Sequence, residues 1–156
     1  MPRTVSAISL SAPPSNNVDK PGWTLLFVAW LLACISTLGS LFLSEVVGLP
    51  PCVLCWWQRV FMYPLVLVLL VGLLHYDGSV VRYALPLVAL GWLTAFYHYL
   101  LYKGYIPETL QPCGQGPSCA EVNLELLGFI TIPMLSLVAF SILAFVLLAI
   151  RKRIGK

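Results

Sequence analysis

Two pairs of cysteines are the residues of this chain whose type and spacing could do chemistry. Cys52 and Cys55 form a Cys-x-x-Cys motif, which occurs in thiol–disulfide enzymes, in zinc sites and at haem attachment sites. Cys113 and Cys119 lie in a segment rich in Gly and Pro, where the five intervening residues can close a small disulfide ring. Each pair could therefore exchange two electrons between a dithiol and a disulfide.

The surroundings of the first pair favour a reactive thiolate. Pro50 and Pro51 precede the motif and suit the first turn of a helix, so the cysteines are expected at a helix N-terminus. The positive end of the helix dipole stabilises a thiolate, which is the form of cysteine that attacks disulfides. Arg59 follows Cys55 by four residues, on the same helical stripe, and its permanent charge would add to this effect.

Some of these features also have purely structural explanations. Arg59 can extend along the helix to place its charge among the lipid headgroups, and Trp56 with Trp57 can form part of an interfacial aromatic belt. Cys113 and Cys119, taken by themselves, can be a structural disulfide that staples an extracytoplasmic loop. These alternatives stay open at the level of the sequence.

The elements that must position the cysteines are membrane helices. The chain is 60% hydrophobic and only 10% charged, with a mean hydropathy of +0.91, which is far from a soluble composition. Crossing the hydrocarbon takes roughly 20 apolar residues, and a helix satisfies its own backbone amides in lipid. We expect an all-α membrane protein, a four-transmembrane-helix bundle embedded in the lipid bilayer. Its spans are expected at about 23–44, 57–75, 83–102 and 128–150, with outer loops at 45–56 and 103–127, and the second helix can begin near Cys52.

The basic residues predict the orientation of this bundle. Four spans place both termini and the 77–82 connection on one side, and of the nine Lys and Arg residues only Arg59 and Lys103 lie on the other. This bias predicts that both termini are cytoplasmic and that both cysteine pairs face the extracytoplasmic side of a plasma or inner membrane. Residues 1–20 are expected to be a disordered tail and 151–156 a basic tail, both cytoplasmic. The net charge of +3 thus reflects topology, and no nucleic-acid partner is expected.

Metal binding is the main chemical alternative to thiol–disulfide exchange for these cysteines. Four outward cysteines could form a tetrahedral thiolate site, but Cys-x5-Cys is not a usual zinc spacing and thiolates at an oxidising surface tend to pair. We therefore expect no metal site. Cys34, in the middle of the first span, is expected to be a small hydrophobe. His98 is either a functional intramembrane group or an interfacial residue between two tyrosines.

The motif Cys52-Val53-Leu54-Cys55 followed by Arg59, in a four-span chain, resembles the DsbB/BdbC family of quinone-dependent disulfide-bond formation proteins. The sequence Gly-Phe-Ile-Thr-Ile-Pro-Met-Leu-Ser-Leu at 128–137 resembles the fourth span of that family. The resemblance covers essentially everything after the N-terminal tail. The close spacing of the loop cysteines is similar to the BdbC-like branch.

This resemblance implies an enzyme, a membrane thiol:disulfide oxidoreductase that supports disulfide-bond formation. Such proteins reoxidise an extracytoplasmic thioredoxin-like thiol oxidase of the DsbA/BdbD type and pass the electrons to membrane quinone, either ubiquinone or menaquinone. By the same resemblance, Cys113 and Cys119 take electrons from the partner, and Cys52 and Cys55 relay them. Arg59 would then bind the quinone beside Cys55.

Three alternatives to this function remain. The chain could be a non-enzymatic membrane anchor or assembly factor with structural disulfides, or a related thiol relay that runs in the reductive direction. A vitamin-K-epoxide-reductase-like enzyme also combines a helical bundle with a Cys-x-x-Cys. In that class the pair is expected towards the C-terminal part of the bundle, whereas Cys52 lies between the first two spans.

Overall fold

The structure, a computed structural model, describes residues 20–106 and 131–154. Its helices are α1 (Lys20–Glu45), α2 (Val53–His75), α3 (Val80–Tyr102) and α4 (Ile132–Ile154), and the described residues contain no strand. All four are long and apolar enough to cross a membrane. The predicted all-α bundle of four membrane-spanning helices is confirmed. The predictions for the N-terminal tail, for most of the second outer loop and for its two cysteines lie outside the described residues.

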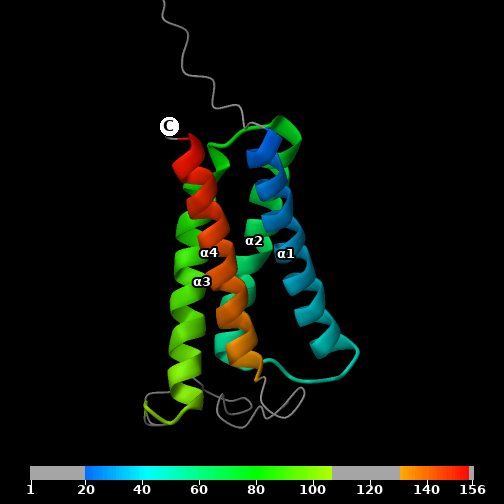
Figure 1. The fold of residues 1–156 in the computed structure, drawn as a ribbon. Helices are drawn as coiled ribbons and strands as arrows, with labels where there is room; N and C mark the ends of the chain where they lie inside the picture. The colour runs from blue at the N-terminus through cyan, green and yellow to red at the C-terminus, as the bar shows by residue number, and fades with distance from the viewer. Residues whose placement is uncertain (1–19, 107–130, 155–156) are drawn as a thin grey trace, which may run out of the picture.

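The four helices form a ring in which each packs mainly against two neighbours. They run alternately up and down (Figure 1). Small residues in the core allow close approach of helices in lipid, and Trp92 Nε1 donates a hydrogen bond of 2.9 Å to Ser141 Oγ between α3 and α4. The ring of Phe140 packs so closely on Gly91 that a Cβ there would overlap it. The centre of the bundle is lined by Leu26, Ala29, Ala33, Leu65, Leu69, Ala84, Val88, Ala95, Phe140, Leu143, Leu147 and Ile150.

The outside of the bundle is apolar as well. Leu38, Leu67 and Phe145 are 65%, 65% and 75% exposed, although each is a large hydrophobic side chain. A helix that is hydrophobic on all faces is expected where lipid takes the place of water. The exposed apolar surface therefore supports the membrane assignment independently of helix length.

Helix α2 begins at Val53, four residues before the expected span, because the Cys-x-x-Cys motif itself opens the helix. Cys52 is the N-cap residue, with φ −70° and ψ 167°, and its carbonyl accepts the first helical hydrogen bond from the Trp56 N–H at 3.1 Å. Residues 53–56 are thus helical and not part of the outer loop. The expectation that both cysteines lie at a helix N-terminus is confirmed.

The cysteine motif and the basic C-terminal residues lie at opposite ends of the bundle (Figure 1). Helix α2 starts at the end where α1 and α3 finish and where α4 begins. The opposite end carries the start of α1, the α2–α3 turn and the basic run Arg151–Arg153. In that turn Tyr76 adopts φ 51°, and Asp77 Oδ1 accepts a hydrogen bond of 2.8 Å from the Ser79 N–H. The bundle therefore has one thiol-bearing end and one basic end.

Candidate functional site

Cys52 and Cys55 form the centre of the site, at the first turn of α2. Their Sγ atoms lie 3.1 Å apart, with Cys52 as the donor, and neither sulfur is in a disulfide. Bonded sulfurs are about 2.05 Å apart, so the pair can close with a shift of roughly 1 Å. Cys52 is 1% exposed, whereas Cys55 is only partly buried. The geometry is therefore that of a dithiol ready to form a disulfide, with Cys55 as the more accessible sulfur.

A buried histidine and glutamine extend this pair into a polar chain. His98 of α3 is 1% exposed and Gln58 of α2 is 8% exposed. The Nε2 atom of His98 lies 3.8 Å from Cys52 Sγ, and its Nδ1 atom lies 3.2 Å from the side-chain nitrogen of Gln58. This burial favours the functional explanation of His98 over the interfacial one. Gln58 was missed by the sequence reasoning, although its spacing of three residues after Cys55 places it on the same face of α2.

Hydrogen bonding and burial determine the protonation state of Cys52. The hydrogen bond to Cys55 and burial raise the pKa of Cys52, which precedes α2, to about 12, while contact with His98 opposes this rise. At Cys52 these effects outweigh the helix dipole, so the expectation of a thiolate stabilised by the helix N-terminus does not hold for this sulfur. Cys52 is therefore a thiol at neutral pH.

The compactness of this group bears on metal binding. Ligand-type atoms of Cys52, Cys55 and His98 all lie within 4.8 Å of one another. Thiols and imidazoles also bind soft metal ions in other proteins, but here the three side chains are linked by hydrogen bonds into a chain that redox chemistry explains. The expectation of no metal site stays a prediction.

Arg59 lies inside the bundle and not among the headgroups. Its side chain is 8% exposed; Nε donates to Ser40 Oγ at 2.7 Å and Nη2 donates to the Ser40 carbonyl at 2.8 Å. The guanidinium carbon also lies 5.5 Å from the ring centroid of Trp56. The alternative in which Arg59 only extends to the membrane surface is not supported. Arg59 instead ties α2 to α1 one turn after Cys55, and its Nη1 atom makes no hydrogen bond to the described residues.

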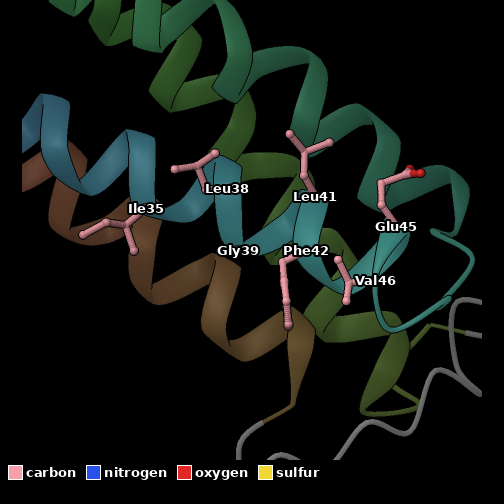
Figure 2. A pocket seen from close by; sticks show the side chains of 7 residues that line it. All are labelled: Ile35, Leu38, Gly39, Leu41, Phe42, Glu45 and Val46. Carbon is pink, nitrogen blue, oxygen red and sulfur yellow. The ribbon is translucent and has the colours of Figure 1, made fainter.

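A shallow apolar hollow of about 630 Å³ lies on the exposed surface of α1 and is lined only by residues of that helix and by Val46, which follows it (Figure 2). Gly39 and Leu41, which flank Ser40 in the sequence, belong to its lining. One turn earlier on α1, Thr37 Oγ1 is buried without a hydrogen-bond partner among the described residues. The lining consists of Ile35, Leu38, Gly39, Leu41, Phe42, Glu45 and Val46.

Cys34 does not belong to this group. Cys34 lies near the middle of α1, away from the end that carries the dithiol. Cys113 and Cys119 lie outside the described residues, so the arrangement of two adjacent pairs stays a prediction. The described part of the site consists of one dithiol, a buried histidine–glutamine pair and a buried arginine.

Comparisons with known proteins identify the family of this chain. The family model described as "Disulfide bond formation protein DsbB" matches residues 21–150. The chain belongs to the DsbB family. It is 50% identical to a probable disulfide formation protein of Metapseudomonas resinovorans over 132 residues, 84% of this chain and 92% of that protein. It is 42% identical to disulfide bond formation protein C of Bacillus subtilis over 115 residues, 74% of this chain and 83% of that protein.

A probable disulfide formation protein of Coxiella burnetii (strain CbuK_Q154) is 48% identical over 126 residues, 79% of this chain and 84% of that protein. No solved structure matches the chain. The resemblance drawn from the cysteine motif is thus confirmed. As a DsbB-family member with four apolar helices, the chain is a multi-pass membrane protein with a role in disulfide-bond formation.

Proposed function

We propose that this DsbB-family protein reoxidises an extracytoplasmic thioredoxin-like thiol oxidase and passes the electrons to membrane quinone. The observation that carries the proposal is the Cys52–Cys55 dithiol, held at the start of α2 one turn from the buried Arg59. A dithiol delivers two electrons on closing to a disulfide, which is the number that converts a quinone to a quinol. A purely structural disulfide would not require a buried cation beside it.

The proposed electron path runs through two thiol–disulfide exchanges. The dithiol of the partner is oxidised by the Cys113–Cys119 disulfide, which becomes a dithiol. That dithiol is then oxidised by the Cys52–Cys55 disulfide, so the two electrons arrive at the pair described above. Both pairs face the extracytoplasmic side, because the basic run Arg151–Arg153 at the opposite end of the bundle favours the cytoplasm.

The residues around the dithiol fit a quinone. A quinone requires hydrogen-bond donors at its ring oxygens and apolar surroundings for its ring and tail. Arg59 offers Nη1 as a donor whose charge favours negative charge on a ring oxygen, and Ser40 holds the guanidinium in a fixed orientation. The Thr37 hydroxyl is a second donor, buried and without a partner among the described residues. The hollow on α1 provides apolar surface that a lipid-soluble molecule can reach from the bilayer.

The redox state of the cysteines in cells tests this proposal. Cysteines are labelled with a maleimide that slows migration on a gel, in cells with and without quinone biosynthesis. We expect Cys52, Cys55 and the loop pair to be mostly oxidised when quinone is present and to accumulate as thiols when it is absent. The experiment uses a Cys34→Ala background, so that the label reports only on the four cysteines of the two pairs. Cysteine pairs that stay fully oxidised without quinone would contradict the proposal.

A further inference from the structure

The hydrogen bonds around Cys52 all run in one direction. The side-chain nitrogen of Gln58 can only donate, so His98 Nδ1 accepts and the proton of the neutral ring lies on Nε2. Nε2 faces Cys52 Sγ at 3.8 Å, and the Cys52 thiol donates to Cys55. A chain of donors thus passes from Gln58 through His98 and Cys52 and ends on the sulfur of Cys55.

Closing the disulfide requires Cys52 to lose its proton, because a thiol is a poor nucleophile and a thiolate is a good one. The surroundings of Cys52 do not favour this loss. Its side chain is 1% exposed and packs with Leu54 and Leu101, which offer no acceptor. Among the described residues, His98 and Cys55 are the titratable groups in contact with its sulfur. The site therefore contains one imidazole at the position where the proton must leave.

We propose that His98 is a catalytic acid–base residue for Cys52 and that Gln58 is its positioning residue. The inference rests on the proposed function. As the disulfide forms, Cys52 Sγ bonds to Cys55 Sγ, the Cys52 S–H bond breaks, and its proton passes to His98 Nε2, which accepts it in the ring tautomer that carries its own proton on Nδ1. Two electrons leave through Cys55 to the quinone acceptor. The quinol carries away two protons, one that has passed through His98 and one from the Cys55 thiol.

Gln58 suits this role because a primary amide can serve both states of the ring. Its NH2 group faces Nδ1 when the ring proton is on Nε2, as in the structure. Nε2 can accept the Cys52 proton only when the ring's own proton lies on Nδ1. In that state the Gln58 amide rotates by half a turn, so that its oxygen accepts the hydrogen bond from Nδ1–H. In the opposite step, when the disulfide is opened, Nε2–H returns a proton to Cys52. A hydrocarbon side chain at position 58 could support neither state.

Other ionisable groups near His98 are few among the described residues. Cys52 and Cys55 approach it from α2, and Tyr97 lies next to it on α3, packed against the same cluster. Arg59, which adjoins Gln58 on α2, is held by Ser40 of α1. Lys103 lies over the ring of Tyr99. The remaining charged residues of the four helices are exposed, namely Lys20 and Glu45 on α1, Arg82 on α3, and Arg151, Lys152 and Arg153 on α4.

Single-turnover oxidation of the reduced full-length protein in lipid nanodiscs tests the inference. The reduced protein is mixed with a short-chain quinone between about pH 5 and 9, and disulfide formation is followed in time. In the wild type we expect a rate that levels off above the pH at which the imidazole loses its proton. General acid–base groups contribute roughly 10²- to 10⁴-fold, so His98→Gln should slow the step about a hundredfold or more. Its rate should then keep rising with pH, since hydroxide replaces the imidazole.

Two further variants separate catalysis from structure. His75→Gln is the matched control, because His75 is the other histidine, is exposed and contacts the Val71 carbonyl at the opposite end of α2. It should keep the wild-type rate and pH profile. Gln58→Leu keeps the imidazole but removes its partner, so the plateau should move along the pH axis. If His98→Gln does not fold, Gln58→Leu tests the inference in its place.

The outcomes distinguish this inference from the proposed function. A folded His98→Gln protein with the wild-type rate and pH profile would overturn the role of His98, as would an unmoved plateau in Gln58→Leu. If the wild type reduces no quinone, the proposed function fails. The same variants are then oxidised with oxidised glutathione, where Cys52 must still lose its proton. An unchanged pH profile with that oxidant would overturn the inference as well.

Discussion

Replacement of Arg59 separates a quinone-binding residue from a helix-packing residue. The guanidinium uses Nε and Nη2 on Ser40, at 2.7 and 2.8 Å, and keeps Nη1 for a ligand. Lysine has a single ammonium group and cannot bridge both Ser40 oxygens while also reaching a quinone oxygen. Arg59→Lys should therefore keep the charge but lose directed donors, and Arg59→Ala should lose both.

The size of the effect follows from the hydrogen bond to quinone that each variant is unable to make. One hydrogen bond to a charged group is worth about 1.5–3 kcal/mol, which corresponds to roughly tenfold to a hundredfold in affinity. We expect the quinone KM to rise by about that factor in Arg59→Lys and further in Arg59→Ala. Ser40→Ala removes the hydroxyl acceptor but leaves the carbonyl and the charge, so its effect should be smaller than that of Arg59→Lys.

Two assays on the same folded variants make this measurement specific. The first measures quinone KM in steady state with a saturating reduced thioredoxin-like partner. The second measures oxidation of that partner in one turnover without quinone, which should be nearly unchanged in Arg59→Lys. An unchanged quinone KM in Arg59→Ala would remove Arg59 from the acceptor site. Equal losses in both assays would show that Arg59 matters only because it holds α2 against α1.

Three further predictions concern the thiols and the packing. Cys55→Ser should abolish quinone reduction in a folded protein. Cys113→Ser should leave oxidation of Cys52 and Cys55 by quinone intact but block oxidation of the partner. Full turnover of the partner by Cys113→Ser would contradict the two-pair relay. Alkylation of Cys52 by iodoacetamide, followed by mass spectrometry, should speed up by about tenfold per pH unit from neutral pH towards its pKa of about 12; a plateau below pH 9 would contradict the raised pKa. Gly91→Ala should lower the free energy of unfolding in detergent by about 1–3 kcal/mol, because the new methyl group overlaps a buried ring. Gly39→Ala, where nothing lies within 4 Å of the added atom, should have little effect.

The sequence was sufficient to predict the helices and the position of the cysteine motif at the start of one of them. Long apolar runs predict four spans, because lipid-facing backbone must pair within a helix. The two prolines and the spacing of the cysteines correctly predict that Cys52 and Cys55 begin a helix. These features depend on neighbouring residues, which a single sequence displays directly.

The contacts between helices could not be predicted in the same way. Arg59 meets Ser40 across 19 residues, and His98 meets Cys52 across 46. Such contacts depend on how each helix is rotated about its axis. In soluble helices an apolar stripe reveals that rotation, but here the apolar residues surround each helix and the pattern carries little information. The burial of Arg59 and the role of Gln58 therefore became visible only in the packed bundle.

Electron stoichiometry in a purified system tests the central claim most directly. Without oxygen, a reduced thioredoxin-like protein is mixed with catalytic amounts of the protein in nanodiscs and a measured amount of quinone. Quinone loss is followed by its absorbance and partner thiols are counted. We predict one quinone reduced for each partner disulfide formed, and no reduction with Cys55→Ser. Partner oxidation without quinone loss, or quinone reduction that persists in Cys55→Ser, would contradict a relay from partner dithiol to quinone through this pair.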